Sequence, residues 1–390
     1  LQVELGKRTD AKATLRAGQQ YQPESTELSR ALLALGEAGP MDAFRVDGKQ
    51  VIAEFMKSSA AETFGGEPAV MLLDRTVVRV LPTAARLTLT HNIIRVLTKD
   101  GLGKFGEVRI PEGADVLVLR TIKADGSTRE PESIPEKDTV SAPDLEVGDF
   151  VEFEYIDHDA PLGAFPRAFL AERFYFASTD APLDRSEYVL ATPADLPLQI
   201  DVRGPSRGPD GTRDVPVAQV SNVGDQRVMT WQRRHVPRLQ PEPPLSEAII
   251  DDWMPSVRVG GGLSFAGYVN YLRERRIRSL YIGRDVRAQA MALAGLPLRA
   301  GDVEGAATEP REQMVVRALK LDAWVRKNIR EGGSIDDAAT AILARREGRR
   351  DILLLAMLRA AGIPAEFWLV RPLNAPQLEG PLPDLTAYAE

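Results

Sequence analysis

The stretch "EGRRDILLLAMLRAAGIPAEFWLV", residues 347–370, decides the expected fold of the second half of the chain. Its middle part, residues 352–358, is apolar on nearly every side, which is typical of a helix buried all round. Gly362 and Pro364 follow, and such residues end a helix. The segment "EFWLV" after them predicts a buried strand. Four charged residues gather at the start of the predicted helix: Glu347, Arg349, Arg350 and Asp351.

The composition is that of a globular protein of several domains, with 390 residues, 44% hydrophobic and 27% charged. A net charge of −7 with interspersed signs argues against nucleic-acid binding, which needs a basic surface. No apolar run approaches the ~20 residues that span a bilayer, so no transmembrane segment is expected. The chain has no cysteine, which excludes thiol chemistry and Cys-ligated metals. Because it begins with Leu1, we expect a fragment or a processed form.

Residues 1–47 are expected to be helical. Gly6, Ala11, Leu15 and Pro23 have the spacing of one tetratricopeptide-like helix, and this resemblance covers a single partial repeat. Ser25 or Thr26 is suited to cap a following helix. The alternative is an ordinary helical hairpin.

Residues 48–245 predict an antiparallel β-sandwich-like domain, because short apolar stretches alternate with turn residues. Asp125-Gly126 is a two-residue hairpin signal. The stretch "VGDFVEFEYID", residues 147–157, alternates strictly and predicts a strand with one buried and one polar face. The Pro-rich segment 238–245 predicts a stiff linker. The expected buried face holds Val151, Phe153 and Tyr155, and the polar face holds Glu152 and Glu154.

Residues 246–390 predict a mainly helical domain, so the chain as a whole is expected to be an α+β multidomain protein. Ser264 is suited to cap one helix, and Gly295 to end the next. Ser334 with Asp337 resembles a capping box, so a further helix is expected from Ser334. Another helix, ended by Gly332-Gly333, is marked by an apolar stripe of Met314, Ala318, Leu321, Val325 and Ile329.

Residues 315–370 resemble the core of transglutaminase-like proteins, which share the papain-type arrangement. The matching segments are "KLDAWVRKNIR", "DDAATAILARREG" and "AMLRAAGIPAEFWLV". The region before them resembles the uncharacterised β-rich domain that precedes this core in many bacterial envelope proteins. That likeness lies in "RVLTKDGLGKFGEVRIP", "IKADGSTREP", "PDLEVGDFVEFEY" and "TWQRRHVPRLQPEPP". Together the two resemblances cover residues 75–370.

The resemblance implies a Cys at the start of the buried helix, a His on the next strand and an orienting Asp or Asn. Here the Cys position falls at Glu347 to Arg350, where no Cys, Ser or His stands. The His segment would lie after residue 385, and "DLTAYAE" resembles its approach, with Glu390 where a His is expected. The resemblance therefore implies a degenerate core, incomplete at its C-terminal end, and a pseudoenzyme without catalytic residues.

Other chemical candidates have simpler structural interpretations. We expect Asp351 to be a first-turn acid stabilised by the helix dipole, and Thr340 to bond backward within a helix. The triglycine Gly260–Gly262 is interpreted as a mobile loop rather than a phosphate site, because no Lys-Ser/Thr follows. His91 is expected in a strand with one polar contact, and His235 without a partner. Asp157, His158 and Asp159 are interpreted as a solvated strand end rather than a metal site, and Asp251 with Asp252 as a turn rather than a glycosidase pair.

These observations lead to one main functional hypothesis and two alternatives. The main one is a non-catalytic scaffold or protein-interaction component of a bacterial envelope assembly, without cofactor or metal. The resemblance alone implies the envelope, and more narrowly the periplasm; the cytoplasm is the alternative. A second hypothesis is a groove for a peptide or cell-wall fragment, in which Arg349 and Arg350 receive an anionic group. The third is a cysteine-free hydrolase.

Overall fold

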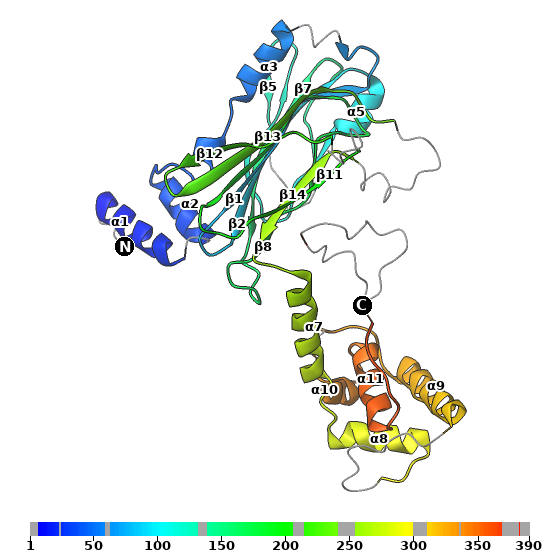
Figure 1. The fold of residues 1–390 in the computed structure, drawn as a ribbon. Coiled ribbons are helices and arrows are strands. Elements are labelled where there is room, and N and C mark those ends of the chain that lie inside the picture. The colour runs from blue at the N-terminus through cyan, green and yellow to red at the C-terminus, as the bar shows by residue number, and fades with distance from the viewer. Residues whose placement is uncertain are drawn as a thin grey trace. The chain divides into compact units, whose positions relative to one another are not determined.

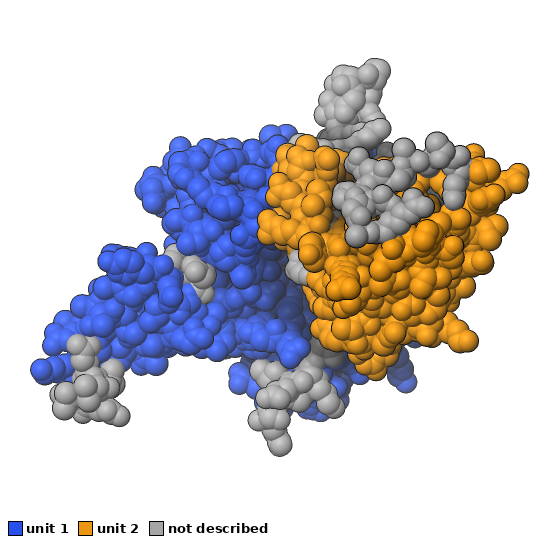
Figure 2. Space-filling model, turned by 90° about the horizontal axis from the view of Figure 1, so that it is seen from below, with its two compact units in different colours: residues 1–263, 374–384 blue, residues 264–373, 385–390 orange. Residues whose placement is uncertain are grey.

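Residue contacts divide the chain into two units, residues 1–263 with 374–384 and residues 264–373 with 385–390 (Figure 2). The computed structural model describes residues 7–22, 25–58, 63–131, 139–205, 214–240, 254–298, 310–334, 337–368 and 382. The expected α+β class is confirmed, with N-terminal helices, large antiparallel-rich sheets and C-terminal helices (Figure 1). The finer division into 1–47, 48–245 and 246–390 stays a prediction.

An eight-stranded sheet forms the centre of the first unit, in the order β12-β13-β10-β1-β2-β7-β4-β5. All neighbours are antiparallel except β1 and β10, which run parallel. The predicted hairpin joins β4 to β5, but its turn carries one residue more than expected, with Gly126 at φ 86°. The strands are β1 (Ala69–Val80), β2 (Arg86–Val96), β4 (Asp115–Ile122), β5 (Thr128–Arg129), β7 (Phe150–Asp159), β10 (Leu183–Pro193), β12 (Gln219–Val223) and β13 (Gln226–Val236).

Smaller sheets cover one face of the large sheet, which makes this region a β-sandwich. The apolar layer between them includes Tyr188 and Trp231 from the large sheet, and Val257 and Val259 from β14. Because β14 pairs with β11, the first unit extends to Leu263. These strands are β8 (Phe169–Leu170), β9 (Phe174–Tyr175), β11 (Gln199–Arg203) and β14 (Ser256–Gly261), and a separate pair is β3 (Glu107–Arg109) with β6 (Thr139–Ser141).

The triglycine segment is not a loop, because Gly260 and Gly261 are strand residues of β14. A Cβ on Gly261 would lie 1.7 Å from the carbonyl oxygen of Pro197, so glycine permits close backbone packing there. The expectation of a mobile loop is therefore wrong at these two positions.

Helices and a short helical turn cover the other face of the large sheet (Figure 1). Ser25 caps the second helix as predicted, with its Oγ accepting the Leu28 N–H at 3.3 Å. Residues 41–57 bring Met41 and Phe55 onto the strands. The elements are α1 (Arg8–Tyr21), α2 (Thr26–Ala34), η1 (Asp42–Phe44) and α3 (Gly48–Lys57), and α5 (Lys99–Phe105) follows β2.

A row of polar side chains crosses this helix-covered face of the sheet. Gln232, Glu187, Arg75, His91 and Glu154 stand opposite one another on β13, β10, β1, β2 and β7. All but Gln232 are buried. Apolar clusters lie on both sides of the row, one around Leu89 and Val77 and one around Leu73 and Ile93. The row therefore divides one face of the core in two.

The buried carboxylates of this row, and the nearby Glu152 on β7, are paired. Glu152 Oε1 lies 3.0 Å from His91 Nε2, and Arg120 Nε donates to Glu152 Oε2 at 2.7 Å. Glu154 accepts from Arg45 Nε at 2.9 Å, and Glu187 accepts from Arg75 Nε at 2.6 Å. Burial raises the pKa of Glu152, but the hydrogen bonds from His91 and Arg120 outweigh it and hold that pKa below its usual value. The lowered pKa values of Glu152 and Glu187 favour the ionised form of these two carboxylates inside the fold.

This arrangement corrects the prediction for β7. Its apolar residues Phe153 and Tyr155 are half-buried, whereas Glu152 and Glu154 are each only 1% exposed. The alternation is real, but the residues before and within α3 cover the glutamate face, so both faces of the strand are inside the fold. A period of two separates the faces and does not say which one meets water.

The second unit is a bundle of helices. Its central helix is α11 (Arg350–Ala360), which contacts α8, α9 and α10 and buries Ile352, Leu353 and Met357. This confirms the buried helix predicted from the sequence. Ser264 Oγ caps α7 at 3.0 Å, and Gly295 ends α8 at φ 68°, both as predicted. The other helices are α7 (Phe265–Ser279), α8 (Arg284–Ala294), α9 (Arg311–Asn328) and α10 (Ala339–Arg345).

Three predictions in this unit are wrong. Helix α9 ends at Asn328, before the predicted stop at Gly332-Gly333, because the chain is already extended at Ile329. Helix α10 begins at Ala339 rather than Ser334, because Asp337 accepts the Ser334 N–H at 3.1 Å and closes a turn before the helix. Thr340 thus lies in the first turn, not mid-helix. Residues 366–368 form no strand, and Trp368 is 71% exposed. Leu369 and Val370 lie outside the described residues.

We predict that Gly48→Ala destabilises the first unit by about 2–4 kcal/mol. A Cβ at Gly48 would lie 1.9 Å from Glu152 Oε1 and would push this carboxylate off His91 and Arg120. The control is Gly103→Ala in α5, where a Cβ meets open space and costs nothing. Urea unfolding of both variants measures the difference. Equal unfolding midpoints would contradict the assigned packing of Glu152.

We also predict that Asp74→Asn stabilises the protein at pH 8 by about 1–3 kcal/mol and hardly at all near pH 4. Burial raises the pKa of Asp74 to about 7 from 3.8, with Ser186 Oγ as its hydrogen-bond donor at 3.2 Å. Because the pKa of Asp74 is raised in the folded state, ionisation of this carboxyl group lowers the free energy of unfolding as pH rises from about 4 to 7. Denaturant unfolding at both pH values tests this. A gain of equal size at both would show that charge is not its cause.

Candidate functional site

The resemblance to transglutaminase-like proteins implies that the nucleophile position lies at the start of α11. Arg349 is the N-cap residue, and its side chain forms a two-pronged ion pair with Asp351 in the first turn. The distances are 3.1 Å from Nε to Oδ1 and 2.8 Å from Nη2 to Oδ2. A cation at a helix start is unfavourable, and the Asp351 carboxylate offsets it. The structure confirms the first-turn position of Asp351 and selects it as the partner of Arg349.

The neighbouring residues join this helix start to the end of α9. Arg350 Nε donates to the carbonyl oxygen of Ile329 at 2.8 Å, and its guanidinium lies 3.6 Å from Glu331. Glu347 forms an ion pair with Arg330. The backbones also pair there, with Gly348 N–H donating to the Arg330 carbonyl at 3.0 Å. We call this group, residues 329–331 with 346–351, the α9–α11 junction.

The backbone at Gly348 explains why a glycine stands in the junction. Its φ is 144°, in the region that favours glycine, and a Cβ would lie 2.6 Å from Ile342 Cγ1. The four predicted residues thus do come together, and their charged groups bind partners within the same unit. The described residues of the junction offer carboxylates and guanidinium groups, and these groups form ion pairs with one another.

The three histidines lie far apart and have separate partners. His91 belongs to the polar row, and His158 Nε2 lies 2.9 Å from Asp115. His235 was expected to lack a partner, but its Nδ1 lies 3.0 Å from Asp184. Asp157 and Asp159 alternate with His158 along β7 and so face the other side of the sheet. Among the residues that the structure describes, no group of three His, Asp or Glu is arranged to hold a metal.

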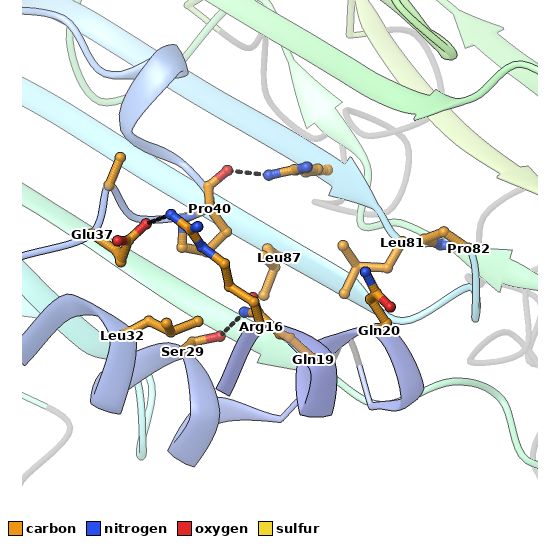
Figure 3. Close-up of a pocket in the computed structure, with 12 residues that line it drawn as sticks. Arg16, Gln19, Gln20, Ser29, Leu32, Glu37, Pro40, Leu81, Pro82 and Leu87 are labelled. Carbon is orange, nitrogen blue, oxygen red and sulfur yellow. Dashed lines mark hydrogen bonds and ion pairs between the residues drawn. The ribbon is translucent and has the colours of Figure 1, made fainter. Parts of the chain in front are cut away.

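Two cavities of the first unit were not predicted from the sequence. One, of about 150 Å³, is lined by threonines and acids and includes the buried Tyr188 hydroxyl, which has no hydrogen-bond partner. The other, of about 350 Å³, lies between the α1–α2 hairpin and the strands (Figure 3), and we call it the hairpin cavity. Its lining residues are Arg16, Gln19, Gln20, Ser29, Leu32, Glu37, Ala38, Pro40, Arg79, Leu81, Pro82 and Leu87.

The lining of the hairpin cavity combines charged, polar and apolar side chains. In Figure 3 the side chain of Arg16, from α1, points toward Glu37, and Gln20 lies near Leu81 and Pro82. Gln19 Nε2 donates to Ser29 Oγ at 3.1 Å and ties α1 to α2. This cavity could not be predicted from the sequence, because its lining comes from three segments that only the folded chain brings together. Asp251 and Asp252, which the sequence predicted to form a turn, lie outside the described residues.

Comparisons with known proteins bear on the fold. Residues 136–240 match a domain of unknown function with solved structures, DUF3857, within the region expected to be an uncharacterised β-rich domain. No curated protein matches the chain. A solved protein of Parabacteroides distasonis, described as a candidate protease, is 16% identical with a TM-score of 0.54. The alignment covers 76% of this chain and 59% of that one, so the chain spans about three fifths of that protein's length.

A second solved protein is too different to guide any conclusion. It is described as a candidate nutrient-binding protein of Legionella pneumophila, with 11% identity and a TM-score of 0.20 over 76% of this chain and 94% of that one. The Parabacteroides likeness concerns the fold alone at 16% identity. The transglutaminase-like assignment of residues 315–370 therefore stays a prediction.

No helix in the described part of the chain is both long and apolar enough to cross a membrane.

We predict that Arg350→Ala loosens the α9–α11 junction by about 1 kcal/mol, because the Ile329 carbonyl loses its donor. Hydrogen exchange of the α11 amide groups measures this loss locally. The control is Arg326→Ala, whose exposed pair with Asp322 on α9 contributes at most about 0.5 kcal/mol. Unchanged α11 protection in Arg350→Ala would show that this contact does not stabilise the junction.

Proposed function

We propose that this chain is a non-catalytic protein-interaction component, built on a transglutaminase-like core that has lost its chemistry. The observation that carries the proposal is the α9–α11 junction. At the place where the resemblance expects a nucleophile, Arg349, Arg350 and Glu347 hold neighbouring parts of the unit together. Selection for packing explains these contacts, because the residues that form them occupy the positions where a catalytic nucleophile would be needed.

The composition supports the same proposal. The chain has no cysteine, its last histidine is His235 and its last serine is Ser334, so residues 347–370 carry no conventional nucleophile or imidazole base. The envelope setting, and more narrowly the periplasm, is proposed from the resemblance. Other proteins are the proposed partners, and no cofactor is part of the proposal.

The groove alternative receives less support at this position. Arg349 and Arg350 would have to exchange their contacts with Asp351, Glu331 and the Ile329 carbonyl for an incoming anion. Replacing an existing ion pair by another gains little, since both states are paired. The groove hypothesis is therefore kept as an outcome of the experiment.

The expected result of an activity screen is no turnover. The purified chain is incubated with fluorogenic peptide, amide and ester probes and with a glutamine–amine transfer assay, next to an active papain-type protease. We expect rates equal to the buffer blank. Turnover that survives repurification and disappears in Asp351→Ala would overturn the proposal and favour the hydrolase hypothesis.

A second experiment separates interaction from groove binding. Partners are captured from an envelope fraction with the original chain and with the Arg349→Ala, Arg350→Ala double variant. We expect the same partners at similar yield, because these arginines act inside the fold. Loss of a partner from a variant that is still folded by circular dichroism would favour the groove.

A further inference from the structure

The hairpin cavity contains a cation that lacks a counter-charge. Arg79, on β1, lines the cavity and is partly buried, and its Nη1 donates to the carbonyl oxygen of Pro40. Its Nε is buried without a hydrogen-bond partner. Among the described residues, no carboxylate lies within ion-pair distance of it. A partly buried guanidinium whose Nε–H lacks a partner is stabilised by an acceptor that binds it.

The other charges around the cavity do not neutralise Arg79. Glu37 is the one acid in the lining, and it already pairs with Arg16 and with Lys12, the latter at 3.0 Å. Burial lowers the pKa of Arg79, and the charge of Asp225 opposes this only from outside ion-pair range. Lys12 and Arg16 thus share the one carboxylate of Glu37, and Arg79 has no carboxylate partner, in a chain of net charge −7. The cavity is a local site of positive charge.

The rest of the lining indicates what kind of anion fits. Leu32, Leu81 and Leu87 offer apolar surface next to Arg79, and Pro40 and Pro82 extend it. The amide of Gln20 has no hydrogen-bond partner among the described residues and supplies both a donor and an acceptor. A volume of about 350 Å³ lies at the small end of ligand pockets, enough for one or two residues of a peptide.

From these contacts we infer that the hairpin cavity binds the C-terminal carboxylate of a peptide whose last residue is apolar. The carboxylate accepts hydrogen bonds from Arg79, the apolar side chain lies against the leucines, and Gln20 bonds the last peptide group. A single unneutralised guanidinium matches one negative charge, which favours a carboxylate over a phosphate dianion. This site lies within the first unit, whereas the α9–α11 junction lies in the second. If the cavity does not bind the peptide, the function proposed from the junction is unaffected.

The test uses a defined probe on the whole chain, the peptide acetyl-Ala-Leu-Leu with a free carboxylate, and its C-terminal amide as the matched ligand. Isothermal titration measures both. We expect the acid to bind at least tenfold tighter than the amide, and its affinity to fall as salt rises. No detectable binding of the acid at millimolar concentration would overturn the inference, and so would equal affinities. Tighter binding of inorganic phosphate than of the peptide would also overturn it.

Two variants separate the roles of the cavity's arginines. Arg79→Gln keeps hydrogen-bond donors but removes the charge, and we expect at least a tenfold loss of affinity for the acid. Arg16→Gln is the control, because the Arg16 charge is already paired with Glu37, and a change under threefold is expected. Equal losses in the two variants would contradict the assignment to Arg79. If Arg79→Gln fails to fold, a shift of the Arg79 Nε–H NMR signal on adding the acid to the original chain decides the question, and no shift refutes it.

Discussion

Burial of the glutamates on the large sheet is the constraint on which the first unit depends. An ionised carboxylate removed from water costs several kcal/mol unless cations and donors surround it. Glu152, Glu154 and Glu187 therefore need partners, and these come from different parts of the chain. Arg75 and Arg120 are strand neighbours, whereas Arg45 comes from the segment before α3. The ion pairs thus fix where the N-terminal segment crosses the sheet, which apolar packing alone specifies less sharply.

The same segment accepts hydrogen bonds through its backbone. Arg75 Nη1 donates to the Phe44 carbonyl at 2.6 Å, and Arg79, four residues along β1, donates to Pro40. The two arginines differ in what else they meet. Arg75 has the buried carboxylate of Glu187, while Arg79 stands beyond the polar row, beside a cavity. Arg75 is thus a structural part of the core, whereas Arg79 is the arginine that we propose binds a ligand.

Features set by neighbouring residues could be predicted from the sequence. Ser25 and Ser264 cap helices because a hydroxyl oxygen accepts an N–H of the first turn, and Gly295 ends one because it adopts positive φ. The buried helix around Leu353 was evident from its unbroken apolar run. Features set by distant segments could not be predicted. The parallel pairing of β1 with β10 joins residues more than 100 positions apart, such as Met71 and Leu183.

The failure at β7 has the same origin. Glu152 and Glu154 look like a solvated face in the sequence. Arg45, more than 100 residues earlier, supplies the charge that permits the burial of Glu154, and His91 and Arg120 do so for Glu152. Part of the candidate site could be predicted, because some of its contacts join neighbouring residues and others join distant segments. The charges at residues 347–351 could be identified, and so could the pairing of Arg349 with a nearby acid. The contact of Arg350 with the Ile329 carbonyl depends on how α9 ends.

The α9–α11 junction shows that the packing of a buried helix and the charges at its start are separate features. Helix α11 is held by apolar contacts with α8, α9 and α10, and these do not involve its first residue. A helix start still exposes unsatisfied N–H groups and a positive dipole end. Asp351 balances that end, and its pairing with Arg349 then draws a cation to a place that would otherwise repel it. Because the packing and the helix start are separate requirements, the start is free to become a connection to α9 while the core remains unchanged.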